Sequence, residues 1–278
     1  MSKGRCVAKN LLKSEDVISS INCIKKLGIK IRLEKSYCEV FGKGLNGYKY
    51  KRNIILNAGN SGTTARLLCA TLIDAKHNIK ITGDKSLRKR DMSRIINPLL
   101  KFGVRFKSTN KRLPLFIKGP KLLKPISYNE NLGSAQCKSA VMIAALKTQG
   151  KTKLKCLPSR NHTEIMFKKV LKIPIKIQKL KNYELIKIDG LKEFNSFNYN
   201  IPGDISSAAF FIVLTLLSKN SFLTIKKVNI NPSRTGVIKI LNKMGAQIKY
   251  FNKKNYKGEI IADIFVKSSK KIKAINCP

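Results

Sequence analysis

The chain has 278 residues, 43% of them hydrophobic, which is enough to bury a substantial core in one large domain or two. Its longest apolar run, 208 to 217, is about half as long as a membrane-spanning helix requires, and the polar start MSKGRC is not a signal peptide, so we expect a cytoplasmic protein. The formal net charge is +42, but the 57 basic residues are spread evenly, which indicates a solvated lysine-rich surface and does not favour a nucleic-acid-binding protein.

Four segments share one layout: an amphipathic helix, in most copies a glycine at its end, and then two short strands. They span residues 23–45, 97–119, 169–191 and 240–266. Equivalent positions, at Gly28, Gly103, Ile173 and Gly245, follow one another at steps of 75, 70 and 72 residues. So constant a period indicates one supersecondary unit used repeatedly.

The first copy begins in the middle of this unit. Its helix is expected after Ser14, which suits an N-cap because Glu15 and Asp16 follow in the first turn. Only one strand is expected upstream of this helix. In the later copies, a further strand and helix precede the equivalent strand. The pattern therefore predicts that the first unit lacks its opening strand and helix.

The second copy shows the whole unit. It adds an expected strand at 54–58 and a helix at about 61–74, so that the full unit reads βαβαββ. Pro98 falls inside its next helix and should kink that helix or begin it. Equivalent helices are expected at 134–147 and 204–218 in the third and fourth copies.

Three of these helices begin with small or hydroxyl residues, near Gly62, Ser134 and Asp204. The first N–H groups of a helix lack internal partners and carry the positive end of its dipole, so they suit an anion. If the copies are related by pseudo-symmetry, these helix starts point toward one shared region. The repeat thus predicts an anion site built from several helix N-termini.

The cysteines and histidines suggest no special chemistry. The cysteines form no C-x-x-C pair and read as small core residues of a reducing compartment. With His77 and His162 as the only histidines and no clustered ligands, we expect no metal site and no cofactor. The cysteine positions are 6, 23, 38, 69, 137, 156 and 277.

Six motifs together resemble those of the enolpyruvyl transferases, and within that family the branch that acts on shikimate 3-phosphate. Each motif alone is weak, but all six occur in the family's order across nearly the whole chain. They are GNSGTTARLL (59–68), GDKSLRKRDM (83–92), GSAQCKSA (133–140), SRNHTE (159–164), PGDISSAAFF (202–211) and NPSRTG (231–236).

The resemblance implies an α/β fold of two domains, each built from three βαβαββ units as an inside-out α/β barrel. Residues 1–200 would form the first domain, without its first strand and helix, and residues 201–278 one of the three units of the second. The implied reaction transfers the enolpyruvyl group of phosphoenolpyruvate to the 5-hydroxyl of shikimate 3-phosphate, in chorismate and aromatic amino acid biosynthesis. Both substrates are anionic, so an electropositive site is needed.

The first glycine bend matches the family's phosphoenolpyruvate site. The resemblance makes Gly62 the residue that lets phosphoenolpyruvate approach closely. Asn60 and Thr63 either cap this helix or contact the ligand. Arg66 is interpreted as a member of a structural ion pair.

Two further matches complete the implied binding site. Arg90 matches the arginine that holds phosphoenolpyruvate, but Asp91 stands where the family usually has proline and puts a carboxylate beside it. Ser134, Ala135 and Gln136 match the segment that binds shikimate 3-phosphate, with Gln136 also near phosphoenolpyruvate.

The remaining motif residues have mixed interpretations. Arg160 is expected to reach the phosphate of shikimate 3-phosphate, and His162 is interpreted as structural. Asn161 replaces a common aspartate, and Asp204 is expected to cap its helix. Lys138 either adds charge to the site or is simply solvated.

No catalytic residue is assigned within these 278 residues. In the family the acid and base groups belong to the last two units of the second domain, and a Lys-Ser-x-Ser-x-x-Arg-type segment ends the first strand. We therefore expect a chain shortened at both ends, monomeric, and without transferase activity alone.

The sequence leaves three alternative functions. A sister enzyme transfers enolpyruvate to UDP-N-acetylglucosamine, but it typically carries a cysteine where Lys85 stands. A basic nucleic-acid-binding protein built on a related repeat would need clustered stacking aromatics or a catalytic histidine. A non-catalytic remnant is the third alternative.

Overall fold

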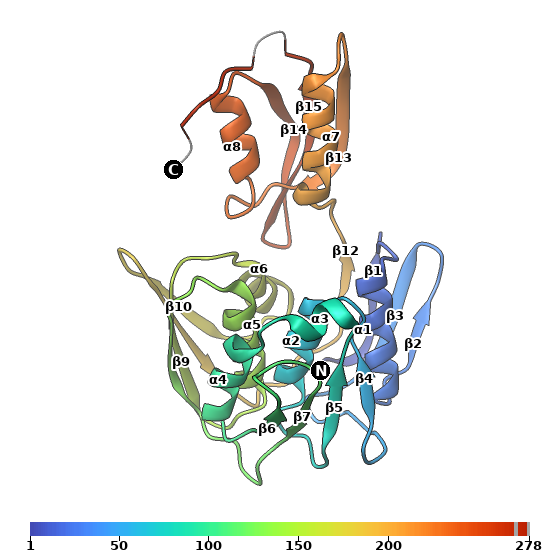
Figure 1. The fold of residues 1–278 in the computed structure, drawn as a ribbon, viewed down its shortest axis with the longest axis vertical. Coiled ribbons are helices and arrows are strands. Elements are labelled where there is room, and N and C mark those ends of the chain that lie inside the picture. The colour runs from blue at the N-terminus through green and yellow to red at the C-terminus, as the bar shows by residue number, and fades with distance from the viewer. Residues whose placement is uncertain (270–271, 277–278) are drawn as a thin grey trace. The chain divides into compact units, whose positions relative to one another are not determined.

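The computed structural model describes residues 1–269 and 272–276, which form two compact units (Figure 1). The first unit comprises Met1–Ser159 and Leu171–Tyr199, and the second comprises Arg160–Val170 and the described residues from Asn200 onward. The break after Tyr199 lies beside the domain boundary expected at 200. The inclusion of 160–170 in the second unit was not foreseen from the sequence.

Three four-stranded sheets form the framework of the first unit. The strand orders are β12-β1-β3-β2, β4-β5-β7-β6 and β10-β11-β9-β8. The strands are β1 (Lys3–Lys9), β2 (Ile31–Leu33), β3 (Tyr37–Lys43), β4 (Ile55–Asn57), β5 (Ile79–Thr82), β6 (Arg105–Ser108), β7 (Leu115–Lys118), β8 (Ser127–Glu130), β9 (Lys151–Cys156), β10 (Ile175–Lys179), β11 (Glu184–Asp189) and β12 (Asn198–Asn200).

The repeat inferred from the sequence is confirmed by strand pairing. In the second copy β4 runs parallel to β5, and β7 then pairs antiparallel with both β5 and β6. In the third copy β8, β9, β11 and β10 repeat this pattern. Mixed α/β units of the expected βαβαββ kind therefore build the chain.

One strand lies where the sequence did not place it. No strand was expected at 198–200, where the structure has β12. This strand borders β1, at the position that a first strand occupies beside β5 and β9 in the other sheets. It thus completes the first sheet, which the sequence predicts to lack its own opening strand.

Helices of different repeats pack together in the first unit. The strongest helix contact joins α2 (Gly62–Thr71) and α5 (Ala135–Leu146), and α4 (Ser93–Lys101) packs against both. Alanines at 140, 144 and 145 of α5 are buried, so neighbouring backbones can approach closely. Two further helices are α1 (Glu15–Lys26) and α3 (Lys85–Lys89).

Of two expectations about helix starts, the position of Ser14 is confirmed and a start at Pro98 is wrong. Ser14 occupies the N-cap of α1, but its side chain makes no capping hydrogen bond. Pro98 does not begin its helix, because α4 starts five residues earlier at Ser93 and continues through the proline to Lys101.

The second unit has three antiparallel strands in the order β13-β15-β14, with α7 and α8 contributing to its core. Its segment 160–170 forms a short helix that runs into a π-helix. The outward side chains of α7 are apolar and exposed; Phe210 is 79% exposed and Leu217 is 73% exposed. The elements are α6 (His162–Ile165), η1 (Met166–Val170), α7 (Ile205–Leu217), β13 (Phe222–Asn229), α8 (Gly236–Lys243), β14 (Gln247–Tyr256) and β15 (Glu259–Lys267).

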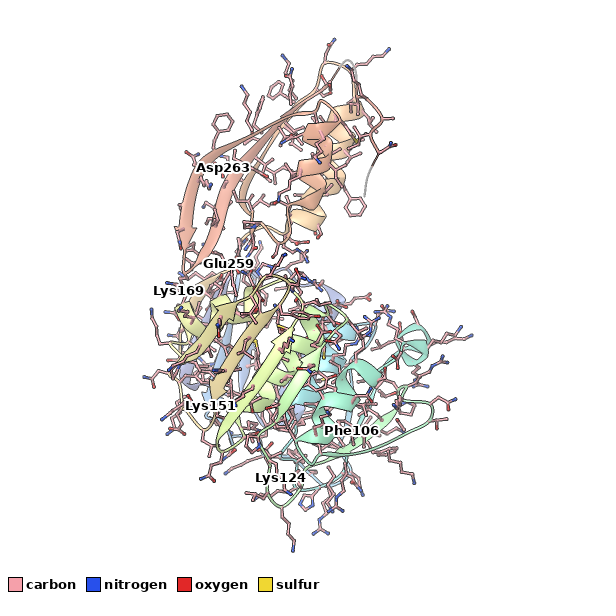
Figure 2. All side chains as sticks on the ribbon, turned by 90° about the vertical axis from the view of Figure 1, so that its left-hand side faces the viewer. Phe106, Lys124, Lys151, Lys169, Glu259 and Asp263 are labelled. Carbon is pink, nitrogen blue, oxygen red and sulfur yellow. The ribbon has the colours of Figure 1, made fainter. Side chains whose placement is uncertain are left out.

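The charge and the cysteines are distributed as the sequence suggests. Basic side chains project outward over both units, among them the labelled Lys124 and Lys151 (Figure 2). Cys6 is partly buried, the other five described cysteines are buried, and Cys277 lies outside the described residues. Among the described helices, none is long and apolar enough to cross a membrane.

Candidate functional site

The starts of α2 and α5 carry the residues expected to bind substrate. Ser61 caps α2, because its Oγ accepts a hydrogen bond from the Thr64 N–H at 3.2 Å. Ser134 caps α5 in the same way, with its Oγ 3.3 Å from the Cys137 nitrogen. The first N–H groups of both helices are left without intrahelical partners and suit an anion.

Gln136 ties the two helix starts together. Its Nε2 donates to Thr63 Oγ1 at 2.8 Å, and its Oε1 accepts from the Arg66 guanidinium at 2.6 Å. The expectation that equivalent helix starts point toward one region is therefore met for α2 and α5. Asp204, at the third such start, lies in the second unit and is described with it.

Gly62 makes room for two guanidinium groups. A Cβ added to Gly62 would lie 3.2 Å from NH1 of Arg90 and 3.4 Å from NH1 of Arg66. Both contacts are tighter than most Cβ contacts, so either arginine would have to move away from a side chain. The glycine lets both positive groups reach the first turn of α2.

Arg90 is held by a short chain of side-chain hydrogen bonds. Its NH2 donates to Asn60 Oδ1 at 2.9 Å, and Asn60 Nδ2 donates to Asp84 Oδ2 at 2.5 Å. The other Asp84 oxygen accepts from the Leu87 N–H at 2.6 Å and caps α3. Neither Asn60 nor Thr63 caps α2, because Ser61 does so.

Positive charge dominates this region. Burial, followed by repulsion from Arg90 and Arg94, lowers the pKa of the Arg66 guanidinium below its ordinary value. Arg66 was expected in an ion pair, but within residues 1–269 and 272–276 it hydrogen-bonds only to Gln136 and the Asp91 carbonyl. The guanidiniums of Arg66 and Arg90 thus lie together at the N-terminus of α2, and among the described residues neither contacts a carboxylate. This arrangement favours an anionic ligand.

The sequence places the Asp91 carboxylate beside Arg90, but among the described residues the two form no ion pair. Oδ1 of Asp91 accepts from the Ser93 N–H at 2.9 Å, and its Oδ2 accepts from the Ser93 hydroxyl. These bonds lower the pKa of the Asp91 carboxyl below its usual range. The carboxylate thus holds the start of α4, while its backbone carbonyl accepts from Arg66 at 3.3 Å.

A buried carboxylate supports the loop before α5. One oxygen of Glu130 accepts from the N–H groups of Leu132 and Ser134, at 3.0 and 3.1 Å. Ala135 is the first residue of α5, so its N–H is among those without an intrahelical acceptor. Glu130 was not singled out from the sequence, since a lone glutamate at a strand end gives no signal of its role.

Lys138 is neither solvated nor near the surface. Its side chain is fully buried in α5, with Nζ 3.6 Å from Glu184 Oε2. The interpretation that Lys138 is simply solvated is therefore wrong, because this lysine belongs to the interior of the first unit. Its contribution of charge to the site stays a prediction.

Residues Arg160 to Glu164 of the SRNHTE motif lie in the second unit, and Ser159 belongs to the first. Arg160 is exposed at the start of that segment and belongs to the second unit, whereas Ser134 belongs to the first. His162 Nδ1 lies 2.7 Å from Glu259 Oε1, and Asn161 Oδ1 accepts from Asn231 Nδ2 at 2.8 Å. These contacts support a structural role for His162.

Asp204 caps α7, as expected. Its Oδ2 accepts from the Ser207 N–H at 3.0 Å and from the Ser207 hydroxyl at 3.1 Å. Its Oδ1 is 3.3 Å from the Arg234 guanidinium.

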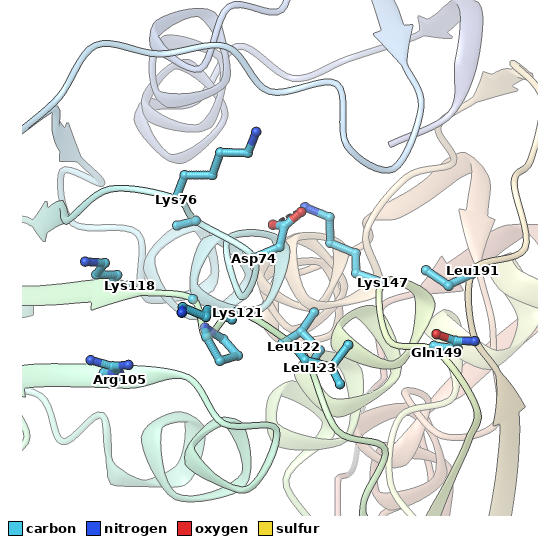
Figure 3. A pocket seen from close by; sticks show the side chains of 13 residues that line it. Asp74, Lys76, Arg105, Lys118, Lys121, Leu122, Leu123, Lys147, Gln149 and Leu191 are labelled. Atoms are coloured by element: carbon cyan, nitrogen blue, oxygen red, sulfur yellow. Dashed lines mark hydrogen bonds and ion pairs between the residues drawn. The ribbon is translucent and has the colours of Figure 1, made fainter.

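A cavity of about 540 Å³ lies away from this site, beyond the C-terminal end of α2. In Figure 3 Asp74 and Lys147 point toward one another within it, with Lys76 and Lys121 nearby. The α2 helix of ten residues separates it from Gly62 by about 15 Å. This cavity is therefore not part of the arginine cluster.

A family model and individual relatives of known name all match this chain to the same family. A family model described as EPSP synthase (3-phosphoshikimate 1-carboxyvinyltransferase) matches residues 1–277. The 3-phosphoshikimate 1-carboxyvinyltransferase of Thermoanaerobacter sp. (strain X514) is 42% identical over 273 residues, 97% of this chain and 62% of its own length. That of Ruthia magnifica is 40% identical over 280 residues, 100% of this chain and 62% of its own.

Solved structures agree in fold. The EPSP synthase of Acinetobacter baumannii superposes with a TM-score of 0.86 at 35% identity, over 100% of this chain and 62% of that one. The chain thus spans about 62% of the length of these relatives.

Proposed function

The chain belongs to the EPSP synthase family, and from this membership we propose that it binds phosphoenolpyruvate and shikimate 3-phosphate. In the proposed reaction the enolpyruvyl group passes to the 5-hydroxyl of shikimate 3-phosphate, giving 5-enolpyruvylshikimate 3-phosphate and phosphate. This reaction belongs to chorismate and aromatic amino acid biosynthesis.

The observation that carries the proposal is the pair of guanidiniums beside Gly62. Arg90 and Arg66 both approach the first turn of α2, and no carboxylate among the described residues forms an ion pair with either. A guanidinium presents paired N–H donors that match a carboxylate or phosphate, and phosphoenolpyruvate carries both groups. We assign phosphoenolpyruvate to this position.

Shikimate 3-phosphate is assigned to the start of α5. The Ser134 hydroxyl and the N–H groups of the first turn, beginning at Ala135, suit its phosphate. Gln136 lies between the two assigned positions, because it contacts Thr63 and Arg66 of α2. Its placement is suited to holding the two substrates side by side. Arg160 is proposed as a further phosphate ligand.

In this proposal the described residues bind, orient and stabilise charge. Phosphate develops negative charge as it leaves, and fixed guanidiniums and helix N-termini stabilise it without reorganisation. The proposal gives none of these residues a proton-transfer role. Lys85, where the UDP-N-acetylglucosamine enzyme typically carries a cysteine, is the first residue of α3, and the similarities favour the shikimate branch.

Calorimetric titration of the chain with phosphoenolpyruvate and shikimate 3-phosphate tests the assignment. Arg90→Ala should weaken phosphoenolpyruvate binding at least tenfold, since a charge-assisted contact contributes about 1.5–3 kcal/mol. Lys89→Ala removes an equal charge from the neighbouring exposed residue and should bind as the parent does. Equal weakening by both variants would show a general charge effect, and RNA binding without substrate binding would favour the nucleic-acid alternative.

We also propose a cytoplasmic monomer. Buried cysteine thiols are typical of proteins from a reducing compartment. The net charge of +42 opposes self-association through repulsion between copies. Light scattering coupled to gel filtration, at low and high salt, measures the mass directly.

A further inference from the structure

The two oxygens of Asp84 contact different partners. Oδ1 accepts from the Leu87 N–H and caps α3, while Oδ2 accepts from the Asn60 amide. Hydrogen bonds from Leu87 and Asn60, ahead of the charge of Arg90, hold the pKa of this carboxyl below its usual range. Capping uses one oxygen, so the second remains available for another role.

The contact with Asp84 sets the direction of the Asn60 amide. An asparagine side chain has a donating NH₂ end and an accepting oxygen end, and an ionised carboxylate only accepts. Asn60 must therefore turn its NH₂ toward Asp84, which leaves its oxygen facing Arg90. That oxygen accepts from NH2 of Arg90, while NH1 of the same guanidinium lies over Gly62.

We propose that Asp84 is a positioning residue for Arg90, acting through the amide of Asn60. The proposal rests on the proposed function, because it concerns the arginine assigned to phosphoenolpyruvate. The neutral amide between Asp84 and Arg90 fixes the guanidinium without an ion pair. A carboxylate in direct contact would hold Arg90 equally well, but it would compete with the anionic substrate.

Two substitutions separate this role from capping. Asp84→Asn keeps an oxygen for the Leu87 N–H but presents an NH₂ to the NH₂ of Asn60, so Asn60 has to turn over and present a donor to Arg90. Asp84→Ser retains a good N-cap residue and has no second oxygen for Asn60. The control is Asp263→Asn, because Asp263 in the second unit likewise accepts from a backbone N–H, that of Lys227, and from an asparagine amide, that of Asn252.

Each variant of the 278-residue chain is tested by two measurements. Nitrogen-15 NMR of the arginine side chains reports whether the Arg90 guanidinium is fixed, with its signal assigned by Arg90→Ala. Titration with phosphoenolpyruvate gives the affinity. Asp84→Asn and Asp84→Ser should each broaden or shift the Arg90 signal and weaken binding about tenfold, while Asp263→Asn leaves both unchanged.

A double variant distinguishes positioning from a general structural effect. If Asp84 acts through Arg90, adding Asp84→Asn to Arg90→Ala should weaken binding no further. An unchanged Arg90 signal in both Asp84 variants would overturn the proposal, as would a tenfold loss that persists without Arg90. If the parent chain does not bind phosphoenolpyruvate, the assignment of the substrate fails, and the NMR signal alone still decides whether Asp84 fixes Arg90.

Discussion

Gln136 and Thr63 are 73 residues apart in the chain, yet the Gln136 amide donates to the Thr63 hydroxyl at 2.8 Å. The two residues lie in the first turns of α5 and α2, which are equivalent helices of neighbouring repeats. The same glutamine accepts from Arg66. Pseudo-symmetry thus brings two helix N-termini together, and one side chain fixes their separation.

Removing this connection should impair binding more than folding. Gln136→Ala leaves Arg66 without its side-chain acceptor, so we expect about tenfold weaker binding of both substrates and a loss of about 1 kcal/mol in stability. Calorimetry and urea unfolding measure the two effects. Gln149→Ala, at an exposed position after α5, is the control, and an equal loss of affinity there would contradict the prediction.

A methyl group at Gly62 should displace the arginines. The added Cβ meets NH1 of Arg90 at 3.2 Å, so Gly62→Ala should weaken phosphoenolpyruvate binding about tenfold while alanine preserves the helix. Gly236→Ala is a matched control, because Gly236 also begins a helix and its Cβ would meet nothing within 4 Å. Unchanged binding by Gly62→Ala would show that the guanidiniums do not define the site.

Asp91 should matter for stability and not for the substrate. Asp91→Ala removes the acceptors for Ser93 at the start of α4, and a lost hydrogen bond typically costs about 0.5–1.5 kcal/mol. Its carbonyl, which accepts from Arg66, remains. Urea unfolding should show the loss, and phosphoenolpyruvate affinity should stay within twofold of the parent; a stronger affinity would mean that the carboxylate does compete for Arg90.

The second unit should lose stability in acid through Glu259. Burial disfavours the ionised carboxyl, but hydrogen bonds from His162, Asn231 and Asn229 outweigh it and lower the pKa of Glu259 below its ordinary 4.5. The lowered pKa stabilises the folded state. This contribution is fully present above about pH 4.5 and is lost as pH falls through the pKa that Glu259 has in the folded protein.

Glu259→Gln tests this contribution. The substitution leaves one fewer acceptor for three donors and should cost about 1–3 kcal/mol at pH 7. The cost should shrink as pH falls below 4.5, which urea unfolding of both proteins at several pH values measures. A cost independent of pH would mean that the ionised form has no special stabilisation.

Lys147 depends on Asp74 for its charge. Its side chain is 1% exposed, and burial lowers the pKa of the ammonium group despite the attraction of Asp74. Asp74→Asn should destabilise the first unit by about 2–3 kcal/mol, below the usual cost of breaking a buried pair because Asp74 is 32% exposed. In thermal unfolding, Asp74→Asn combined with Lys147→Met should recover most of this loss; no recovery would exclude an uncompensated charge as the cause.

The sequence was most informative where signals are local. The expected helices at 61–74, 134–147 and 204–218 match α2, α5 and α7 closely, because small capping residues and apolar spacing lie within each segment. The repeat period also predicted the strand pattern, since each unit has to bury the same apolar faces.

The pairing of strands from distant segments could not be predicted from the sequence. Nothing within residues 198–200 specifies that β12 pairs beside β1 and not with its own repeat, because short strands pair wherever an edge is free. For the same reason the link from Asp84 through Asn60 to Arg90 was not foreseen. Its members look like a cap, a loop residue and a surface arginine when each is considered alone.

The return of the chain from residues 160–170 affects the order in which the protein can fold. β10 and β11 follow this segment, so the sheet that also contains β8 and β9 acquires two of its strands only after the chain has left the first unit and come back. During synthesis on the ribosome, therefore, β9 has an unpaired edge until β11 has been made and can pair with it. A single proteolytic cut cannot separate the units either, since two links would still join them.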